Sequence, residues 1–204
     1  MWILILWGRR QREKHLGYAA DYCPICRKVE TFDILEKRIC RHIWFIPVER
    51  GELLGHAKIC GGCQTESEGF PNAYREIIGF RGKSLDTLIA KTNPMVREIH
   101  KEKLALADQV AAGIDGIDEA TRHRLMMEAF SFAERHFHSG YGHQGRRILA
   151  VSLRPLQPKE EEIRACLQRY RETGSRMGAR LRTAEVMLSI YPESEAKDPN
   201  KFSY

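Results

Sequence analysis

The sequence has no apolar run long enough to cross a membrane. The run at its start, Trp2 to Trp7 in MWILILW, has six residues, whereas a helix that spans a bilayer needs about 20. Arg9 and Arg10 follow this run, although a secretory signal carries its basic residues before the apolar stretch. We therefore expect a protein without a transmembrane segment or an export signal.

The sequence also lacks the short motifs of several enzyme classes. It contains no phosphate-binding glycine loop, no nucleophile elbow and no H-E-x-x-H motif. The glycines of GYGHQG follow a predicted helix, where a dinucleotide loop would follow a strand. The motifs alone therefore give no catalytic site.

The composition is that of an ordinary globular protein. Of 204 residues, 43% are hydrophobic and 29% are charged, with a formal net charge of +6. Both signs of charge are interspersed along the chain, whereas a dedicated nucleic-acid binder clusters its basic residues more tightly. The charge permits an anionic partner without requiring one.

Apolar patterning divides the chain into two parts. Residues 1–66 contain short runs rich in β-branched and aromatic residues, such as VETFDILE and ICRHIWFIPV. From Pro71 onward the period becomes helical, beginning with PNAYREII and SLDTLIAK. We predict an α+β protein with a β-rich zinc ribbon over residues 1–66, an all-α helical domain over 67–192 and a flexible tail over 193–204.

Capping signals predict the later helices. Asn93-Pro94 begins one that extends to about Ala112, and Pro158 with three following glutamates begins another. Asp118 caps a longer helix whose apolar face comprises Leu125, Met126, Ala129, Phe130, Ala133 and Phe137. A last helix is expected from Ser175 to about Ile190.

Four cysteines form two C-x-x-C pairs, Cys23-Pro-Ile-Cys26 and Cys60-Gly-Gly-Cys63. A two-residue spacer lets one tight turn direct two thiolates to the same point, and two such turns complete the tetrahedron that zinc prefers. The 33 residues between the pairs exceed the usual spacing but accommodate extra strands. We predict one structural zinc ion bound by Cys23, Cys26, Cys60 and Cys63, because four thiolates leave no position for water or substrate.

These motifs, in their order, resemble a known family. Trp7-Gly8-Arg9-Arg10, the first cysteine pair, the run Trp44-Phe45-Ile46-Pro47-Val48 and the second pair are similar to the small bacterial zinc-ribbon proteins of the zinc-ribbon 15 type. The resemblance covers roughly residues 1–66, and the sequence has Arg27 where such a turn often has glycine. The resemblance implies a zinc ribbon with the four cysteines as ligands. It does not imply an enzymatic activity.

The N-terminal run has two interpretations. Alternate side chains of residues 2–7 point to opposite faces of a strand, and all are apolar, so a strand buried on both faces is expected. The rival is a shallow membrane contact through Trp2 and Trp7, with the arginines behind them.

Other candidate ligands are weaker. Cys40 and Cys166 are interpreted as a small strand residue and a helix-face thiol. His136, His138 and His143 form a histidine cluster, but no nearby acid completes a ligand set, so a solvated helix end is expected.

The sequence favours a non-catalytic, cytoplasmic zinc-binding protein whose helical domain contacts a protein partner or a second copy of itself. One alternative is an enzyme with its site at the domain junction, using the histidine cluster. Another is nucleic-acid binding through basic residues of the ribbon: Arg9, Arg10, Arg12, Lys14, Arg27, Lys28, Arg38 and Arg41.

Overall fold

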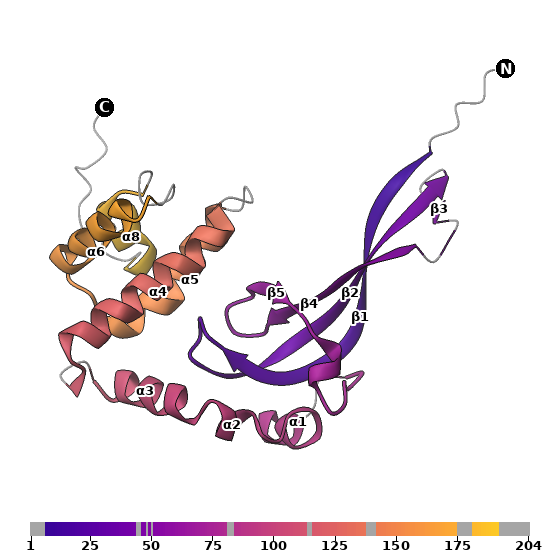
Figure 1. Cartoon of the computed structure of the whole chain (residues 1–204), viewed down its shortest axis with the longest axis horizontal. Coiled ribbons are helices and arrows are strands. Elements are labelled where there is room, and N and C mark those ends of the chain that lie inside the picture. The colour runs from indigo at the N-terminus through magenta and orange to yellow at the C-terminus, as the bar shows by residue number, and fades with distance from the viewer. Residues whose placement is uncertain are drawn as a thin grey trace. The chain divides into compact units, whose positions relative to one another are not determined.

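A computed structural model shows the predicted α+β architecture, with a sheet followed by helices (Figure 1). It describes residues 7–43, 46–47, 49, 51–80, 84–113, 116–137, 142–174 and 181–191. The chain divides into two compact units. The first comprises Met1–Cys23 and Val29–His100, and the second comprises Pro24–Lys28 and Lys101–Tyr204. The predicted domain boundary at residue 66 stays a prediction.

The sheet of the first unit has the strand order β1-β2-β4-β5, and β3 also pairs with β2. The strands are β1 (Trp7–Cys23), β2 (Lys28–Ile43), β3 (Ile46–Pro47), β4 (Glu52–Cys60) and β5 (Glu66–Glu68). β2 and β4 run antiparallel, from Phe32 opposite Cys60 to Ile39 opposite Glu52, with an irregularity after Lys37. This register places the end of β4 beside the start of β2.

The second half of β1 is buried, whereas its first half is charged and exposed. Ala19 and Ala20 are fully buried, and Tyr18 pairs with Ile78 through an isolated bridge. Gly17 has φ +144, and a Cβ there would lie 2.4 Å from the carbonyl oxygen of Ile78. Only glycine permits this close approach.

Helix α1 (Leu85–Thr92) begins where SLDTLIAK predicts, because the Ser84 hydroxyl accepts a hydrogen bond from the Thr87 amide at 3.2 Å. Leu88 and Ile89 are buried where α1 packs on β1. The buried Thr92 hydroxyl donates to the Leu88 carbonyl at 2.8 Å and accepts from the Ala20 amide at 2.9 Å. Thr92 therefore joins the helix to the strand.

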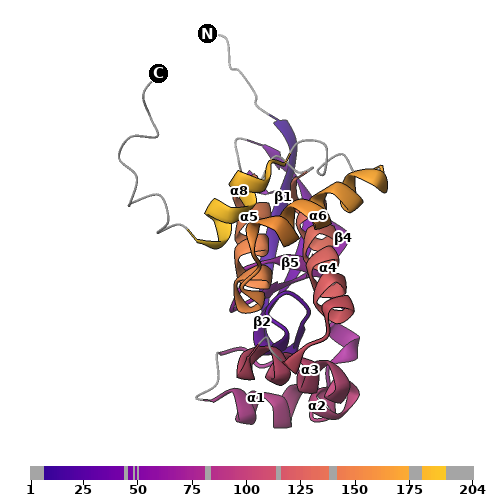
Figure 2. The same ribbon diagram turned by 90° about the vertical axis from the view of Figure 1, so that its left-hand side faces the viewer.

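The second unit contains helices that pack on one another (Figure 2). They are α3 (Lys101–Ala112), α4 (Glu119–Phe137), α5 (Gly142–Leu153), α6 (Glu160–Glu172) and α8 (Thr183–Ile190). The predicted apolar face of α4 is confirmed, because its residues are buried. The exception is Phe137, whose side chain is not described. Asp118 caps α4, accepting from the Thr121 amide at 2.8 Å.

Three local predictions are wrong. PNAYREII forms only the 3-10 turn η1 (Pro71–Ala73) and the bridge at Ile78. The helix expected from Pro94 is divided at His100 into α2 (Val96–Ile99) and α3. Leu181 and Arg182 precede the last helix, which begins at Thr183; residues 175–180 lie outside the described residues.

The predicted strand over residues 2–7 also lies outside the described residues, apart from Trp7. Trp7 is 83% exposed at the start of β1. At this residue the prediction of burial on both faces is wrong. No helix in the described part of the chain is long and apolar enough to cross a membrane.

Candidate metal centre

Two turns bring four cysteine sulfurs together. Cys23 is the last residue of β1 and Cys60 the last residue of β4, and each C-x-x-C turn follows directly. The ligand atoms of Cys23, Cys26, Cys60 and Cys63 all lie within 4.8 Å of one another. The structure therefore brings together the four residues that the spacing of the sequence selected.

The geometry of the cluster fits a tetrahedral metal ion. Zinc–sulfur bonds of about 2.3 Å give a tetrahedron with edges of about 3.8 Å, and the sulfurs of Cys23 and Cys63 are 3.7 Å apart. A disulfide would bring two sulfurs to about 2.05 Å, and none of the six cysteines forms a disulfide. The donor set is thus four thiol groups, the chemistry that favours zinc.

The cluster is largely shielded from water. Cys23, Cys60 and Cys63 are at most 2% exposed, and Cys26 is half-buried. Cysteines bind a metal ion as thiolates, and four thiolates this close would repel one another strongly in a medium of low dielectric constant. A divalent cation at their centre would remove that repulsion, so the residues present fit a bound metal.

Backbone hydrogen bonds hold the second turn in place. The Gln64 amide donates to the Cys60 carbonyl at 2.8 Å, and the Cys60 amide donates to the Thr65 carbonyl at 3.1 Å. The Gly61 amide donates to Thr31 of β2 at 2.8 Å. These bonds fix the turn against the sheet.

The other two cysteines lie apart from the cluster. Cys40 is buried on β2, and a Cβ at Gly51, which has φ +79, would lie 2.5 Å from its sulfur. Cys166 is buried in α6, and this burial raises the pKa of its thiol to about 11. Within the described residues, the four-cysteine group is the only potential metal site with three or more ligands.

The histidine cluster is only partly described. His136 lies in the last turn of α4, and His138 is outside the described residues. His143 is in α5, but its side chain is not described. The expectation of a solvated helix end stays a prediction.

The basic residues predicted to bind nucleic acid fall into three groups. Arg38 and Arg41 lie on β2 and form ion pairs with Glu36 and Glu49. Arg9, Arg10, Arg12 and Lys14 are exposed along the first half of β1. Arg27 and Lys28 belong to the other compact unit, where Arg27 donates to the carbonyl of Leu125 at 3.4 Å. Nucleic-acid binding through these residues stays a prediction.

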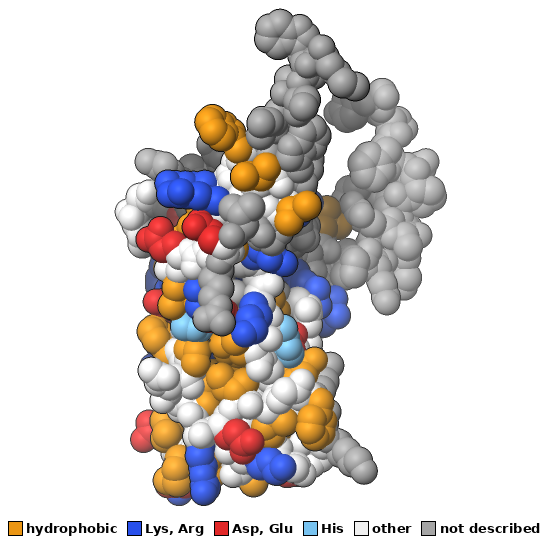
Figure 3. All heavy atoms as spheres, turned by 90° about the vertical axis from the view of Figure 1, so that its right-hand side faces the viewer, with side chains coloured by type: hydrophobic (Ala, Val, Ile, Leu, Met, Phe, Trp, Pro, Cys, Tyr) orange, Lys and Arg blue, Asp and Glu red, His pale blue; other side chains and the backbone are white. Residues whose placement is uncertain are grey.

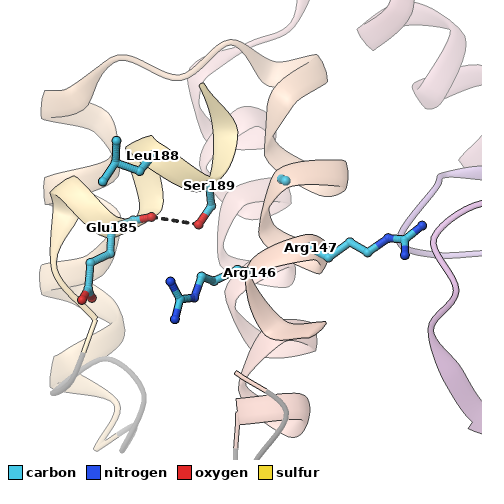
Figure 4. Close-up of a pocket in the computed structure, with 6 residues that line it drawn as sticks. Arg146, Arg147, Glu185, Leu188 and Ser189 are labelled. Atoms are coloured by element: carbon cyan, nitrogen blue, oxygen red, sulfur yellow. Dashed lines mark hydrogen bonds between the residues drawn. The ribbon is translucent and has the colours of Figure 1, made fainter. Parts of the chain in front are cut away.

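Sequence reasoning missed a hollow between α5 and α8. It has a volume of about 270 Å³ and is lined by Arg146, Arg147, Ala150, Glu185, Leu188 and Ser189. Figure 4 shows Arg146 on the side of Glu185, whereas Arg147 points away from α8. Helix α5 begins at Gly142, within the stretch GYGHQGRR.

Comparisons with known proteins give no relative. No protein-family model matches the chain, and neither the curated proteins nor the solved structures provide a match. The ribbon-like site therefore rests on the four clustered cysteines themselves.

Proposed function

We propose that the four-cysteine cluster binds one zinc ion with a structural role, in a non-catalytic protein. The observation that carries this proposal is the convergence of four sulfurs within 4.8 Å, three of them from buried residues. Four thiolates fill all positions of tetrahedral zinc, so no position remains for a water nucleophile or a substrate. A zinc ion there would cross-link the end of β1 to the end of β4.

Energetic considerations support a structural role. A β unit of about 60 residues buries too little surface to be safely stable alone. Zinc binding contributes roughly 10 to 16 kcal/mol in isolated fingers, enough to determine whether such a unit folds. Six cysteines without a disulfide also support a reducing, cytoplasmic location.

Chelation tests the structural role. Removal of zinc from the full-length protein with a strong chelator should abolish the β-sheet signal in circular dichroism, and added zinc should restore it. A chelated protein that keeps its sheet and its melting temperature would contradict the proposal.

We propose that the helical domain contacts a protein partner, which is either a different protein or a second copy of this chain. The hollow between α5 and α8, of about 270 Å³, supports this, because it combines apolar and charged side chains on the surface of the two helices. Leu188 and Ala150 supply apolar surface, and Arg146 and Glu185 supply charges. Such a hollow suits one side chain of a docking protein segment.

A variant that fills the hollow tests this role. Full-length protein and its Ala150→Arg variant would be used as baits in extract of the native host, with light scattering to detect self-association. A partner or a dimer that is lost in Ala150→Arg is the expected result. Lys91→Glu, an exposed substitution on α1, should leave the interaction intact. An interaction that survives Ala150→Arg would exclude the hollow as the contact.

A further inference from the structure

Exposed apolar side chains gather at one end of the sheet. They come from the start of β1, the end of β2 and β3, and we name them the apolar tip: Trp7, Ile43 and Ile46. A Cβ at Gly8 would lie 2.8 Å from the ring of His42, so the start of β1 lies beside the end of β2. Trp7 is 83% exposed and Ile46 is 67% exposed, and Ile43 stands directly opposite Ile46 in the pairing of β2 with β3. Single exposed apolar residues are normal, but a gathered set marks an interaction surface.

Four basic side chains follow Trp7 along β1. We name them the basic collar: Arg9, Arg10, Arg12 and Lys14. All four are exposed, and none forms an ion pair with an acidic side chain in the ranges that the structure describes. Neighbouring cations on β2 are compensated, because Arg38 contacts Glu36 and Arg41 lies 3.6 Å from Glu49. The Glu36 carboxylate, whose pKa is lowered by its hydrogen bond to Arg38 and also by the charge of Lys14, partly compensates Lys14. The excess positive charge next to the apolar surface therefore lies on Arg9, Arg10 and Arg12. Figure 3 shows apolar and basic side chains on one face of the molecule, with acidic side chains among them.

The combination of apolar and basic surface indicates which kind of partner binds there. Nucleic acid would use the basic collar but leave the aliphatic side chains of the tip in water. A second copy of the chain would bring two positively charged collars together, which costs electrostatic free energy. An anionic bilayer satisfies both parts, because tryptophan and aliphatic side chains enter the interface while lysine and arginine attract acidic lipids.

Distances along β1 predict which cations matter most. At about 3.3 Å per residue, Arg9 and Arg10 lie about 7 to 10 Å from Trp7 along the strand, and Lys14 lies about 23 Å away. The potential of a charged membrane decays over about 8 Å at physiological ionic strength. Arg9 and Arg10 are thus within reach of the lipid phosphates when Trp7 is inserted.

We propose that the apolar tip and the basic collar dock the protein reversibly on the surface of an anionic lipid bilayer. The contact is peripheral and inserts only the end of the sheet. It is independent of the metal site and of the helical partner surface.

Sedimentation with vesicles tests this proposal on the full-length, metal-loaded protein. Vesicles of equal parts phosphatidylcholine and phosphatidylserine should pellet the protein, vesicles of phosphatidylcholine alone should not, and binding should weaken as salt increases. Two double variants separate the components: Trp7→Ser with Ile46→Ser removes apolar surface, and Arg9→Glu with Arg10→Glu reverses charge. Each should lower vesicle affinity by about tenfold or more.

Matched controls come from elsewhere in the same unit. Phe80 is 70% exposed, so Phe80→Ser removes a comparable aromatic ring, and Lys91→Glu on α1 reverses a comparable charge. Both should bind vesicles like the wild type. The melting temperature of each variant distinguishes lost binding from lost folding, and the charge variant tests the proposal even if the apolar variant unfolds.

Three results would overturn the proposal. One is failure of the wild type to pellet with the mixed vesicles. Another is a dimer in light scattering that disappears in the Trp7→Ser, Ile46→Ser variant while vesicles are not bound. The third is a salt-dependent shift of an RNA or DNA oligonucleotide that needs Arg9 and Arg10, again without vesicle binding.

Discussion

Arg27 and Gln64 adopt the same left-handed backbone conformation, with φ 55 and 58, each directly after the second cysteine of its C-x-x-C pair. Left-handed backbone is costly for residues with a Cβ, by roughly 1 to 2 kcal/mol. Two such residues at equivalent places mean that both turns follow the same path. Two turns with the same backbone conformation can each direct two thiolates to one ion.

The first prediction concerns Gln64. Gln64→Val should lower the free energy of unfolding by about 1 to 2 kcal/mol, because a β-branched residue disfavours positive φ more strongly than glutamine. Gln64→Gly should be tolerated, with a change of less than about 1 kcal/mol, because glycine adopts this conformation readily. Denaturant titration of both variants measures the difference. Equal loss in the two variants would show that the side chain of Gln64, which donates to Gly61 at 2.9 Å, matters more than its backbone.

The second prediction distinguishes ligands from other cysteines. Cys23→Ser or Cys60→Ser should abolish zinc binding and unfold the predicted ribbon over residues 1–66, since hydroxyl replaces thiolate poorly and binding is coupled to folding. Cys40→Ser and Cys166→Ser should keep the metal, because both lie outside the cluster. Metal content and circular dichroism give the result. Metal loss in Cys40→Ser equal to that in Cys23→Ser would mean a different ligand set.

The third prediction concerns the contact between α1 and β1. Thr92→Val should cost about 1 to 3 kcal/mol, because it removes the oxygen that accepts from the buried Ala20 amide. Thr92→Ser retains that oxygen and should cost less. Chemical denaturation compares them. A Thr92→Val variant as stable as the wild type would show that the hydrogen bonds of the Thr92 hydroxyl contribute little to stability.

The fourth prediction follows from the pKa of Cys166. Burial raises this pKa from 9.0 to about 11 in the folded protein, so the unfolded chain loses its thiol proton first as pH rises. The neutral thiol therefore stabilises the fold fully below pH 9, and this contribution is lost between pH 9 and about 11. It amounts to about 3 kcal/mol.

Comparison with Cys166→Ala isolates this effect, because the tyrosines titrate in both proteins. Between those two pH values the wild type should lose more stability than the variant in denaturant titrations. Identical pH dependence in the two proteins would show that Cys166 keeps its ordinary pKa.

The sequence predicted the features that depend on local spacing. Two C-x-x-C pairs specify two turns, and the four sulfurs do meet. The α4 face was predictable because Leu125, Ala129 and Ala133 recur at helical spacing and are buried. The Ser84 cap likewise marks the start of α1.

Features that depend on distant contacts were not predictable. Tyr74 and Ile78 are four residues apart and mimic a helix face, but Tyr74 donates to Asp21 at 3.0 Å and Ile78 pairs with Tyr18. The first half of β1 is a charged stretch without apolar alternation, so its pattern gave no strand signal. Pairing with β2 makes it a strand.

The start of the last helix depends on a specific cap. The Arg182 amide donates to the Glu185 carboxylate at 3.1 Å, which fixes the first turn at Thr183. Arginine is not among the residues preferred at helix caps. The apolar spacing alone therefore could not locate this start.

The number of zinc ions per chain tests the central claim most directly. Elemental analysis of the purified full-length protein, normalised by amino-acid analysis, should give one zinc per chain, because four clustered thiols complete one tetrahedron. A value near two would add a second site and restore the histidine cluster as a candidate. A value near zero in protein that is folded and fully reduced would contradict the account, because the four cysteines would then hold the sheet without a metal.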